Sequence, residues 1–307
     1  CFFRLALVGN HPAHPMSSRL PLQNGYILKG YTISEVLGGG GFSLVYLASN
    51  ELQRGKMVIK EYCPQDLVAR QTDGAIEPNS PLAQAPFRQG LERFRLEAQR
   101  MSEVKHPNII SVSEYFEANN TLYMVMAHEE GRDLRWFIKK LAGQLDWDFL
   151  KQVFPAIGEG LWRMHQHGVV HLDVKPANVL LRTSGQPLLL DFGAAQTLSD
   201  DDRFGSFQTL THGFAPPEQY LDGNLGTWTD IYGLAATIYS CITGSSPPPA
   251  LKRQEGATLE KLTVSRTGQY PYTLLKTLEA ALSLDYGERP ADMGAFLSLA
   301  FGAPQGG

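Results

Sequence analysis

Cysteine is scarce in this sequence. The 307 residues include only three cysteines, Cys1, Cys63 and Cys241, at wide spacings. An odd number of distant cysteines excludes a disulfide framework and the closely spaced pairs of a zinc site. Because unpaired thiols persist in reducing compartments, we expect a cytoplasmic location, with membrane attachment only through segments outside this sequence.

Long apolar runs and an excess of either charge are also missing. The longest apolar stretch, near residues 231–241, is well short of the ~20 residues that a membrane helix needs. A formal net charge of −4 gives no basic surface for nucleic acid or for anionic lipid. We therefore expect no nucleic-acid partner and no membrane segment in this chain. The 43% hydrophobic content is that of a globular protein, and the length fits two units or one bilobal unit.

The apolar pattern changes from strands to helices along the chain. Residues 31–37 alternate as in a strand, and two further strand-like runs follow them. Residues 88–104 carry apolar residues every three or four positions, as in a helix. Residues 63–90, rich in Pro, Gln, Asp and Asn, are typical of a long irregular connection. The sequence predicts strands at 31–37, 45–48, 57–60, 109–116 and 122–127, followed by helices at 146–166 and 230–243 and two more within 271–302.

A glycine run, a lysine and a glutamate occur in that order within the β-rich part. Gly38 to Gly41 separate two predicted strands, and glycine lets a backbone approach phosphates closely. Alone, such a run is more often a flexible hairpin. Lys60 lies inside an apolar strand, where its charge needs a partner, and Glu97 on the following helix can supply it. Together the three features predict a binding site for the phosphates of a nucleoside triphosphate.

Two polar motifs follow in the helical part. In residues 171–178, Asp173 can accept the proton of an attacking hydroxyl, Lys175 can neutralise a phosphoryl group, and Asn178 offers a neutral oxygen to Mg²⁺. Asp191, at the end of a short apolar strand and before Phe-Gly, is a second candidate Mg²⁺ ligand. This spacing favours phosphoryl transfer over a plain polar loop.

Taken together, these motifs resemble the signature set of Hanks-type serine/threonine protein kinases, most closely the bacterial subgroup. The resemblance covers about residues 30–301. It implies an α+β fold with a β-rich N-lobe, containing one main helix, and a larger α-helical C-lobe. The implied division is a leader that can be flexible at 1–25, the N-lobe at 26–126, a hinge at 127–131, the C-lobe at 132–302 and a tail at 303–307.

The resemblance also implies a role for each motif residue. Catalytic roles fall to Asp173 as base, Lys175, the Lys60–Glu97 pair and Thr211, and Asn178 and Asp191 would bind Mg²⁺, or Mn²⁺ in its place. Glu218 would pair with Arg289, and Asp230 would anchor the catalytic loop. ATP would contact Leu37, Gly38, Gly40, Ser43, Val45, Val58, Lys60, Met126 as gatekeeper, the hinge residues Ala127 and Glu129, Asp133 and Leu180.

Lys175 and the position of Thr211 favour Ser/Thr over Tyr as acceptor, and autophosphorylation is expected. Leu172 stands where many regulated kinases have an arginine that needs a loop phosphate. We therefore expect activity without phosphorylation of the activation segment, in which Thr209 is the best candidate acceptor. The resemblance implies protein substrates in bacterial signalling, and the 63–90 connection, which leads into the Glu97 helix, is a candidate site for a regulatory partner.

Two other functions share parts of this pattern. A pseudokinase would bind nucleotide without transfer, and Ser43 and Leu172 are the departures that favour it. A small-molecule kinase of similar fold generally lacks the residues found here at Lys175, Thr211 and Glu218.

Overall fold

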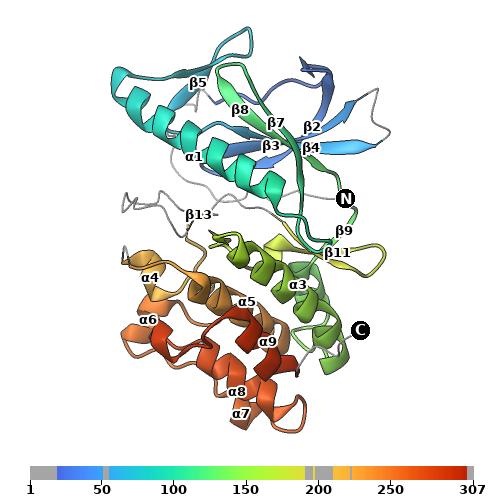
Figure 1. Ribbon diagram of the computed structural model, residues 1–307, viewed down its shortest axis with the longest axis vertical. Coiled ribbons are helices and arrows are strands. Elements are labelled where there is room, and N and C mark those ends of the chain that lie inside the picture. The colour runs from blue at the N-terminus through green and yellow to red at the C-terminus, as the bar shows by residue number, and fades with distance from the viewer. Residues whose placement is uncertain (1–18, 51–54, 191–195, 198–209, 222, 303–307) are drawn as a thin grey trace. The chain divides into compact units, whose positions relative to one another are not determined.

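The computed structural model describes residues 19–50, 55–190, 196–197, 210–221 and 223–302. The chain divides into two compact units (Figure 1). Unit 1 contains the chain up to Glu103 and the segment Ser111–Glu129, whereas unit 2 contains Val104–Ile110 and the chain from Glu130 onward. The β-rich and helical parts expected from the sequence correspond to these two units.

Unit 1 is built on a six-stranded antiparallel sheet in the order β1-β2-β3-β4-β8-β7. Side chains are buried alternately along the strand Ser43–Asn50, whereas the strands Lys56–Tyr62 and Thr121–Ala127 each bury several consecutive side chains. Ile33, Tyr46 and Ile59 are completely shielded from solvent. The strands are β1 (Ile27–Leu28), β2 (Tyr31–Gly39), β3 (Ser43–Asn50), β4 (Lys56–Tyr62), β7 (Val112–Ala118) and β8 (Thr121–Ala127).

The long connection after β4 is more regular than the sequence indicated. It forms a hairpin of β5 (Val68–Arg70) and β6 (Ile76–Pro78), whose turn contains Gly74 at φ +95°. A 3₁₀ turn (Pro81–Ala83), capped by the side chain of Ser80, then leads into helix α1 (Gln84–Glu103). The helix therefore begins four residues earlier than its apolar periodicity suggested.

Helix α1 packs its apolar face on strands β7 and β8. Phe87, Phe94, Ala98 and Met101 are its buried residues, and their spacing of three, four and seven places them on one side of the helix. This face fixes which side of the helix carries Glu97.

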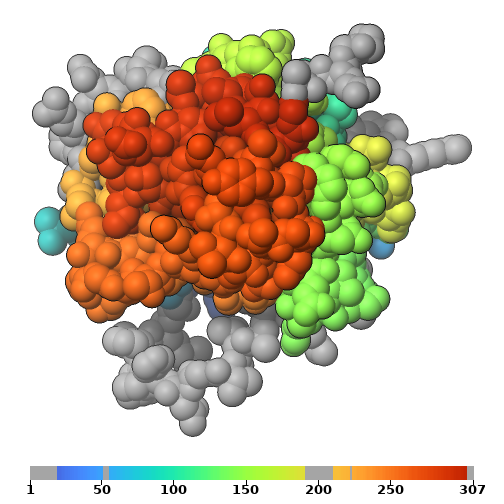
Figure 2. Space-filling view, turned by 90° about the horizontal axis from the view of Figure 1, so that it is seen from below, coloured from blue at the N-terminus to red at the C-terminus, as the bar shows by residue number. Residues whose placement is uncertain are grey.

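Unit 2 is mainly helical. Asp146 caps α3 (Trp147–Gln166), and α5 (Thr227–Thr243) is buried along almost its whole length. Figure 2 shows the face that helices α6 to α9 form in orange and red. The remaining elements are β9 (Gly131–Asp133), α2 (Leu134–Lys140), β10 (Val169–Val170), a 3₁₀ turn at Pro176–Asn178, β11 (Val179–Arg182), β12 (Pro187–Leu189), β13 (Gln196–Thr197), α4 (Pro217–Tyr220), α6 (Ala250–Gln254), α7 (Leu262–Ser265), α8 (Tyr272–Ala281), a 3₁₀ turn at Tyr286–Glu288 and α9 (Met293–Phe301).

Small sheets in unit 2 position the polar motifs. Strands β12, β11 and β9 form one antiparallel sheet, and β10 pairs with β13. The segment that contains Asp173 therefore lies between β10 and β11, two strands of different sheets. Over the described ranges, no helix is both long and apolar enough to cross a bilayer.

Candidate active site

In unit 1, Lys60 and Glu97 form the pair that the sequence predicted. The Lys60 Nζ lies 3.4 Å from Glu97 Oε1, and both side chains are about nine-tenths buried. Lys60 is in the middle of β4, between Val45 on β3 and Met124 on β8, and its ammonium group lies over the Phe94 ring. Because an isolated charge is costly to bury, this pair holds α1 to the sheet at one defined point.

The glycine run forms the turn between β2 and β3. A Cβ on Gly39 would lie 2.8 Å from the carbonyl oxygen of Ser43, so the two arms of the turn approach too closely for any side chain. Gly38, at φ +158°, begins the turn, and Gly40 and Gly41 have open space around them. Glycine is therefore needed here for the close approach of the two arms.

The residues of unit 1 that are expected to contact ATP beyond the glycine turn lie on four adjoining strands or just after the last of them. Val58 on β4 pairs with Met126 on β8, and Met57 pairs with Ala127. Val45 on β3 pairs with Lys60. Leu37 on β2 is buried, and Glu129 follows the end of β8. Their contacts with ATP remain predictions.

In unit 2, three polar side chains meet around the Asp173 carboxylate. Lys175 Nζ lies 2.7 Å from Asp173 Oδ2 and donates a 2.9 Å hydrogen bond to Thr211 Oγ1. The Thr211 hydroxyl donates to Asp173 Oδ1 at 3.1 Å. Asn178 Nδ2 donates to the Asp173 backbone oxygen at 2.9 Å and to its Oδ2 at 3.1 Å. The carboxylate is thus fixed from three sides while about a fifth of its side chain stays exposed.

The side-chain amide of Asn178 points its nitrogen toward Asp173. Its amide nitrogen is occupied by Asp173, so the amide oxygen is the group left to bind a cation, and Mg²⁺ prefers oxygen ligands. The residues present therefore fit a divalent ion. The second predicted ligand, Asp191, lies outside the described residues, as does the rest of its Asp-Phe-Gly motif. In the described part of the chain, no cluster of three or more His, Cys, Asp or Glu residues could hold a metal ion.

Asp230 anchors the backbone that precedes Asp173. It accepts hydrogen bonds from the amides of His171 (2.8 Å) and Leu172 (2.7 Å) and lies 2.8 Å from His165 Nε2. Burial alone would raise the pKa of Asp230, but the His165 hydrogen bond and the two histidine charges hold the pKa below its ordinary value. A carboxylate that is ionised at neutral pH therefore fixes Leu172, which has the unusual φ of +63°.

The segment after Thr211 is tied to the same loop. Gln219 Nε2 donates to the Leu172 carbonyl oxygen at 2.9 Å. Glu218 forms the expected pair with Arg289, in which two guanidinium nitrogens lie 2.6 and 3.0 Å from its two oxygens. Both of these side chains are almost completely buried.

Two further predicted residues, Asp133 and Leu180, pair across β9 and β11. Asp133 caps helix α2 by accepting from the Trp136 amide, and it also pairs with Arg135 at 2.6 Å. Its carboxylate thus has a structural role, and the expected contact with ribose remains a prediction.

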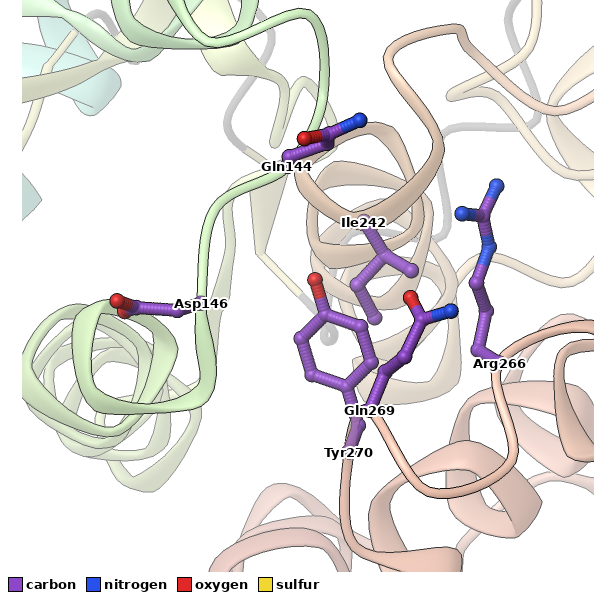
Figure 3. A pocket seen from close by; sticks show the side chains of 6 residues that line it. All are labelled: Gln144, Asp146, Ile242, Arg266, Gln269 and Tyr270. Carbon is purple, nitrogen blue, oxygen red and sulfur yellow. The ribbon is translucent and has the colours of Figure 1, made fainter.

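A hollow of about 420 Å³ in unit 2 contains none of these residues (Figure 3). Ile242, Gln269 and Tyr270 extend toward it, whereas Asp146 points away and caps α3. The Tyr270 hydroxyl donates to the Leu145 carbonyl oxygen. Since its lining polar groups mainly support the fold, we do not assign catalysis to it.

Sequence reasoning missed the packing of β4 against α1. The Tyr62 ring stacks on Phe87 and lies 5.6 Å from Phe94, and a Cβ on Gly90 would come within 1.9 Å of the Tyr62 hydroxyl. Gly90, near the start of the predicted helical stretch, was the available signal, because glycine within a helix is unfavourable unless something packs closely against it.

Comparison with known proteins decides the family. The family model described as the protein kinase domain matches residues 31–291, most of the chain. The chain belongs to the protein kinase family. This kinase domain is 30% identical over 228 residues to the serine/threonine-protein kinase PrkC of Bacillus subtilis. The aligned region covers 71% of the chain and 31% of PrkC. It is 31% identical over 253 residues to serine/threonine-protein kinase B of Synechocystis, which covers 77% of the chain and 41% of that protein.

A solved structure, the apo form of PpkA-294, has 31% sequence identity and a TM-score of 0.78 over 91% of the kinase domain and 99% of that chain. The recognition of a bacterial Hanks-type serine/threonine kinase and the expected kinase fold are confirmed. The matched region spans a quarter to a third of the length of several curated relatives. The family implies ATP, a divalent metal ion and protein substrates.

Proposed function

We propose that this kinase domain transfers the γ-phosphoryl group of ATP to Ser or Thr hydroxyls of proteins in bacterial signalling. The observation that supports it most is the cluster in which Lys175, Thr211 and Asn178 all contact the Asp173 carboxylate. The loose transition state of phosphoryl transfer depends on positioning and charge neutralisation, and this cluster supplies both.

The residues divide the chemistry between them. Lys60, held by Glu97, would neutralise the α- and β-phosphates. Asp173 would orient the acceptor hydroxyl and take its proton, as a new P–O bond forms to the acceptor oxygen and the bond to ADP breaks. Lys175 would neutralise the moving phosphoryl group. A divalent ion on Asn178 and Asp191, for which we propose Mg²⁺ with Mn²⁺ as a substitute, would supply further charge neutralisation to the phosphates.

Intact mass after incubation with ATP and Mg²⁺ tests this function. We expect added phosphate on the wild-type chain, none on an Asp191→Ala control, and phosphate on Ser or Thr but not on Tyr of a generic protein substrate. Binding of ATP without transfer to either target would instead support a pseudokinase. Transfer to small hydroxyl compounds alone would support a small-molecule kinase. Because ATP is the substrate, we propose that the domain works in the cytoplasm.

We also propose that the 63–90 connection receives a regulatory partner. The connection joins β4, which contains Lys60, to α1, which contains Glu97, and the exposed Leu82 lies beside the start of that helix. A partner that binds there can alter the Lys60–Glu97 pair. A Leu82→Asp variant should keep the basal transfer rate and lose any activation by cell extract. An unaltered response to extract would argue against this site.

A further inference from the structure

The tip of the glycine loop is bonded through its carbonyl oxygens. Just beyond β4, the Cys63 amide donates to the Phe42 carbonyl oxygen at 2.8 Å, and the Gln65 amide donates to the Gly41 carbonyl oxygen at 2.7 Å. The first residues of the connection therefore hold two consecutive peptide groups of the loop.

Arg19 holds the two residues on either side. One of its terminal guanidinium nitrogens donates to the Gly40 carbonyl oxygen at 2.7 Å, and the other donates to that of Ser43. The Gly40 amide also donates to the Ser43 carbonyl oxygen, which closes the turn. A single side chain from upstream thus bridges both ends of the tip.

The backbone beside Arg19 is itself fixed. Arg70 Nε donates to the Leu20 carbonyl oxygen at 2.5 Å, and Arg70 forms a buried ion pair with Glu61. Leu22 is only 3% exposed, and its amide donates to the Tyr46 hydroxyl. Arg19 is therefore attached to a segment that is hydrogen-bonded and buried in unit 1, and it is suited to fix a loop that is rich in glycine.

This arrangement suits a loop that binds phosphate. A phosphate needs backbone N–H groups and is repelled by carbonyl oxygens. The carbonyl groups of the tip are occupied by donors of unit 1, and within the described residues the amides of Gly41 and Phe42 donate no hydrogen bond. Because glycine loses much conformational entropy on ordering, fixing the tip beforehand reduces the free-energy cost of binding a ligand.

We propose that Arg19 is a positioning residue that holds the glycine loop ready for the phosphates of ATP. The proposal rests on the proposed function, because it assumes that this loop binds ATP. Arg19 acts through the loop carbonyls and not by contact with the nucleotide.

Hydrogen exchange of the nucleotide-free protein tests whether Arg19 restrains the glycine loop. In Arg19→Ala, we expect a peptide covering residues 39–44 to exchange about tenfold faster, as local opening becomes easier. Arg88→Ala, which removes an exposed arginine of the same unit, should leave this peptide unchanged. Unchanged exchange in Arg19→Ala would overturn the proposal, whatever the protein does with ATP.

Nucleotide affinity tests whether the hydrogen bonds from Arg19 to the loop assist phosphate binding. If the glycine loop of Arg19→Ala adopts its phosphate-binding conformation in only about a tenth of the molecules, the Kd for Mg-ATP should rise about tenfold. The Kd for adenosine, which has no phosphates, should stay the same. Equal weakening of both ligands, or of neither, would overturn the assignment to phosphate binding. The Kd of Arg19→Lys for Mg-ATP should fall between those of the wild type and of Arg19→Ala, because a compact ammonium group bridges two carbonyl oxygens less well than a guanidinium group does.

The exchange and affinity measurements distinguish a failure of the role proposed for Arg19 from a failure of the proposed kinase function. A wild-type protein that binds neither Mg-ATP nor adenosine would refute the proposed function, and the exchange measurement would still decide whether Arg19 holds the loop. If Arg19→Ala unfolds, Arg19→Lys serves in its place, with the same directions and smaller changes.

Discussion

Leu172 shows how a single residue changes what the catalytic loop requires. Its side chain is buried, its amide bonds to Asp230 and its carbonyl oxygen bonds to Gln219. An arginine at this position would introduce a charge that needs an anion, whereas leucine needs none. The loop in which Asp173 lies is thus held by neutral packing and by Asp230.

We therefore predict that Thr209→Ala keeps the rate of phosphoryl transfer within about threefold of wild type, because no cation at position 172 awaits a loop phosphate. Steady-state kinetics with a protein substrate would measure it. A tenfold increase in kcat for Thr209→Asp would contradict this prediction. Thr209 itself lies outside the described residues.

Asp173 allows a sharper prediction. Replacing it by Asn preserves its size but removes the base, so transfer should fall roughly 10²–10⁴-fold while the Kd for Mg-ATP changes little. Phosphate incorporation and nucleotide titration measure the two quantities. Asp148→Asn, at an exposed position in the first turn of α3, is the matched control and should be neutral. Equal activity of the two variants would remove Asp173 from the mechanism.

At the scale of elements, the contact between β4 and α1 sets the distance between Lys60 and Glu97. Tyr62 follows Lys60 by two residues, and Gly90 precedes Glu97 by two turns of the helix. The Tyr62 side chain fills the space that a Cβ on Gly90 would occupy. Burial raises the pKa of Tyr62 to about 12, so its ring stays neutral in this contact at physiological pH.

We predict that Gly90→Ala pushes α1 away from β4 and lowers kcat/KM for ATP roughly 10²-fold, because a displacement of about 1 Å is enough to misplace a catalytic pair. Adding Tyr62→Leu should restore much of the rate by vacating the space. Gln89→Ala, on the exposed side of the same helix, should have no effect. Failure of Tyr62→Leu to rescue would show that Gly90 acts in another way.

Element order could be predicted because it depends on local periodicity. The long-range pairs, such as Lys60 with Glu97 and Glu218 with Arg289, could be predicted only because the motifs resemble a known family. The β5–β6 hairpin was missed, although Asp73-Gly74 between two short apolar runs is a turn signal. The contact between Arg19 and Gly40 could not be predicted, because it joins a side chain outside the motifs to a backbone carbonyl oxygen 21 positions away. Nor does sequence spacing reveal that Tyr62 fits against a particular glycine.

At the scale of the whole molecule, the buried Glu218–Arg289 pair joins segments 71 residues apart in unit 2. We predict that Arg289→Met lowers the free energy of unfolding by about 3–5 kcal/mol, because it leaves a buried carboxylate without its partner. Lys252→Met removes one side of the exposed pair with Glu255 and should leave the free energy of unfolding almost unchanged, because solvent screens this pair.

Urea unfolding followed by tryptophan fluorescence measures this difference for unit 2 alone, since all four tryptophans of the chain, Trp136, Trp147, Trp162 and Trp228, belong to that unit. A loss no greater than that of Lys252→Met would show that the buried pair adds little to stability. Parallel measurement by circular dichroism would report unit 1 as well.

The position of Arg19 has a practical consequence for the choice of fragment boundaries. The family match begins at Tyr31, so a fragment cut there keeps each predicted catalytic and nucleotide-contacting residue yet lacks Arg19 and Leu22. Such a fragment would be judged complete by its motifs, but its glycine loop would have lost one of its two sets of anchors. A weak ATP affinity measured on this fragment would then result from the missing Arg19 and would not be a property of the longer chain.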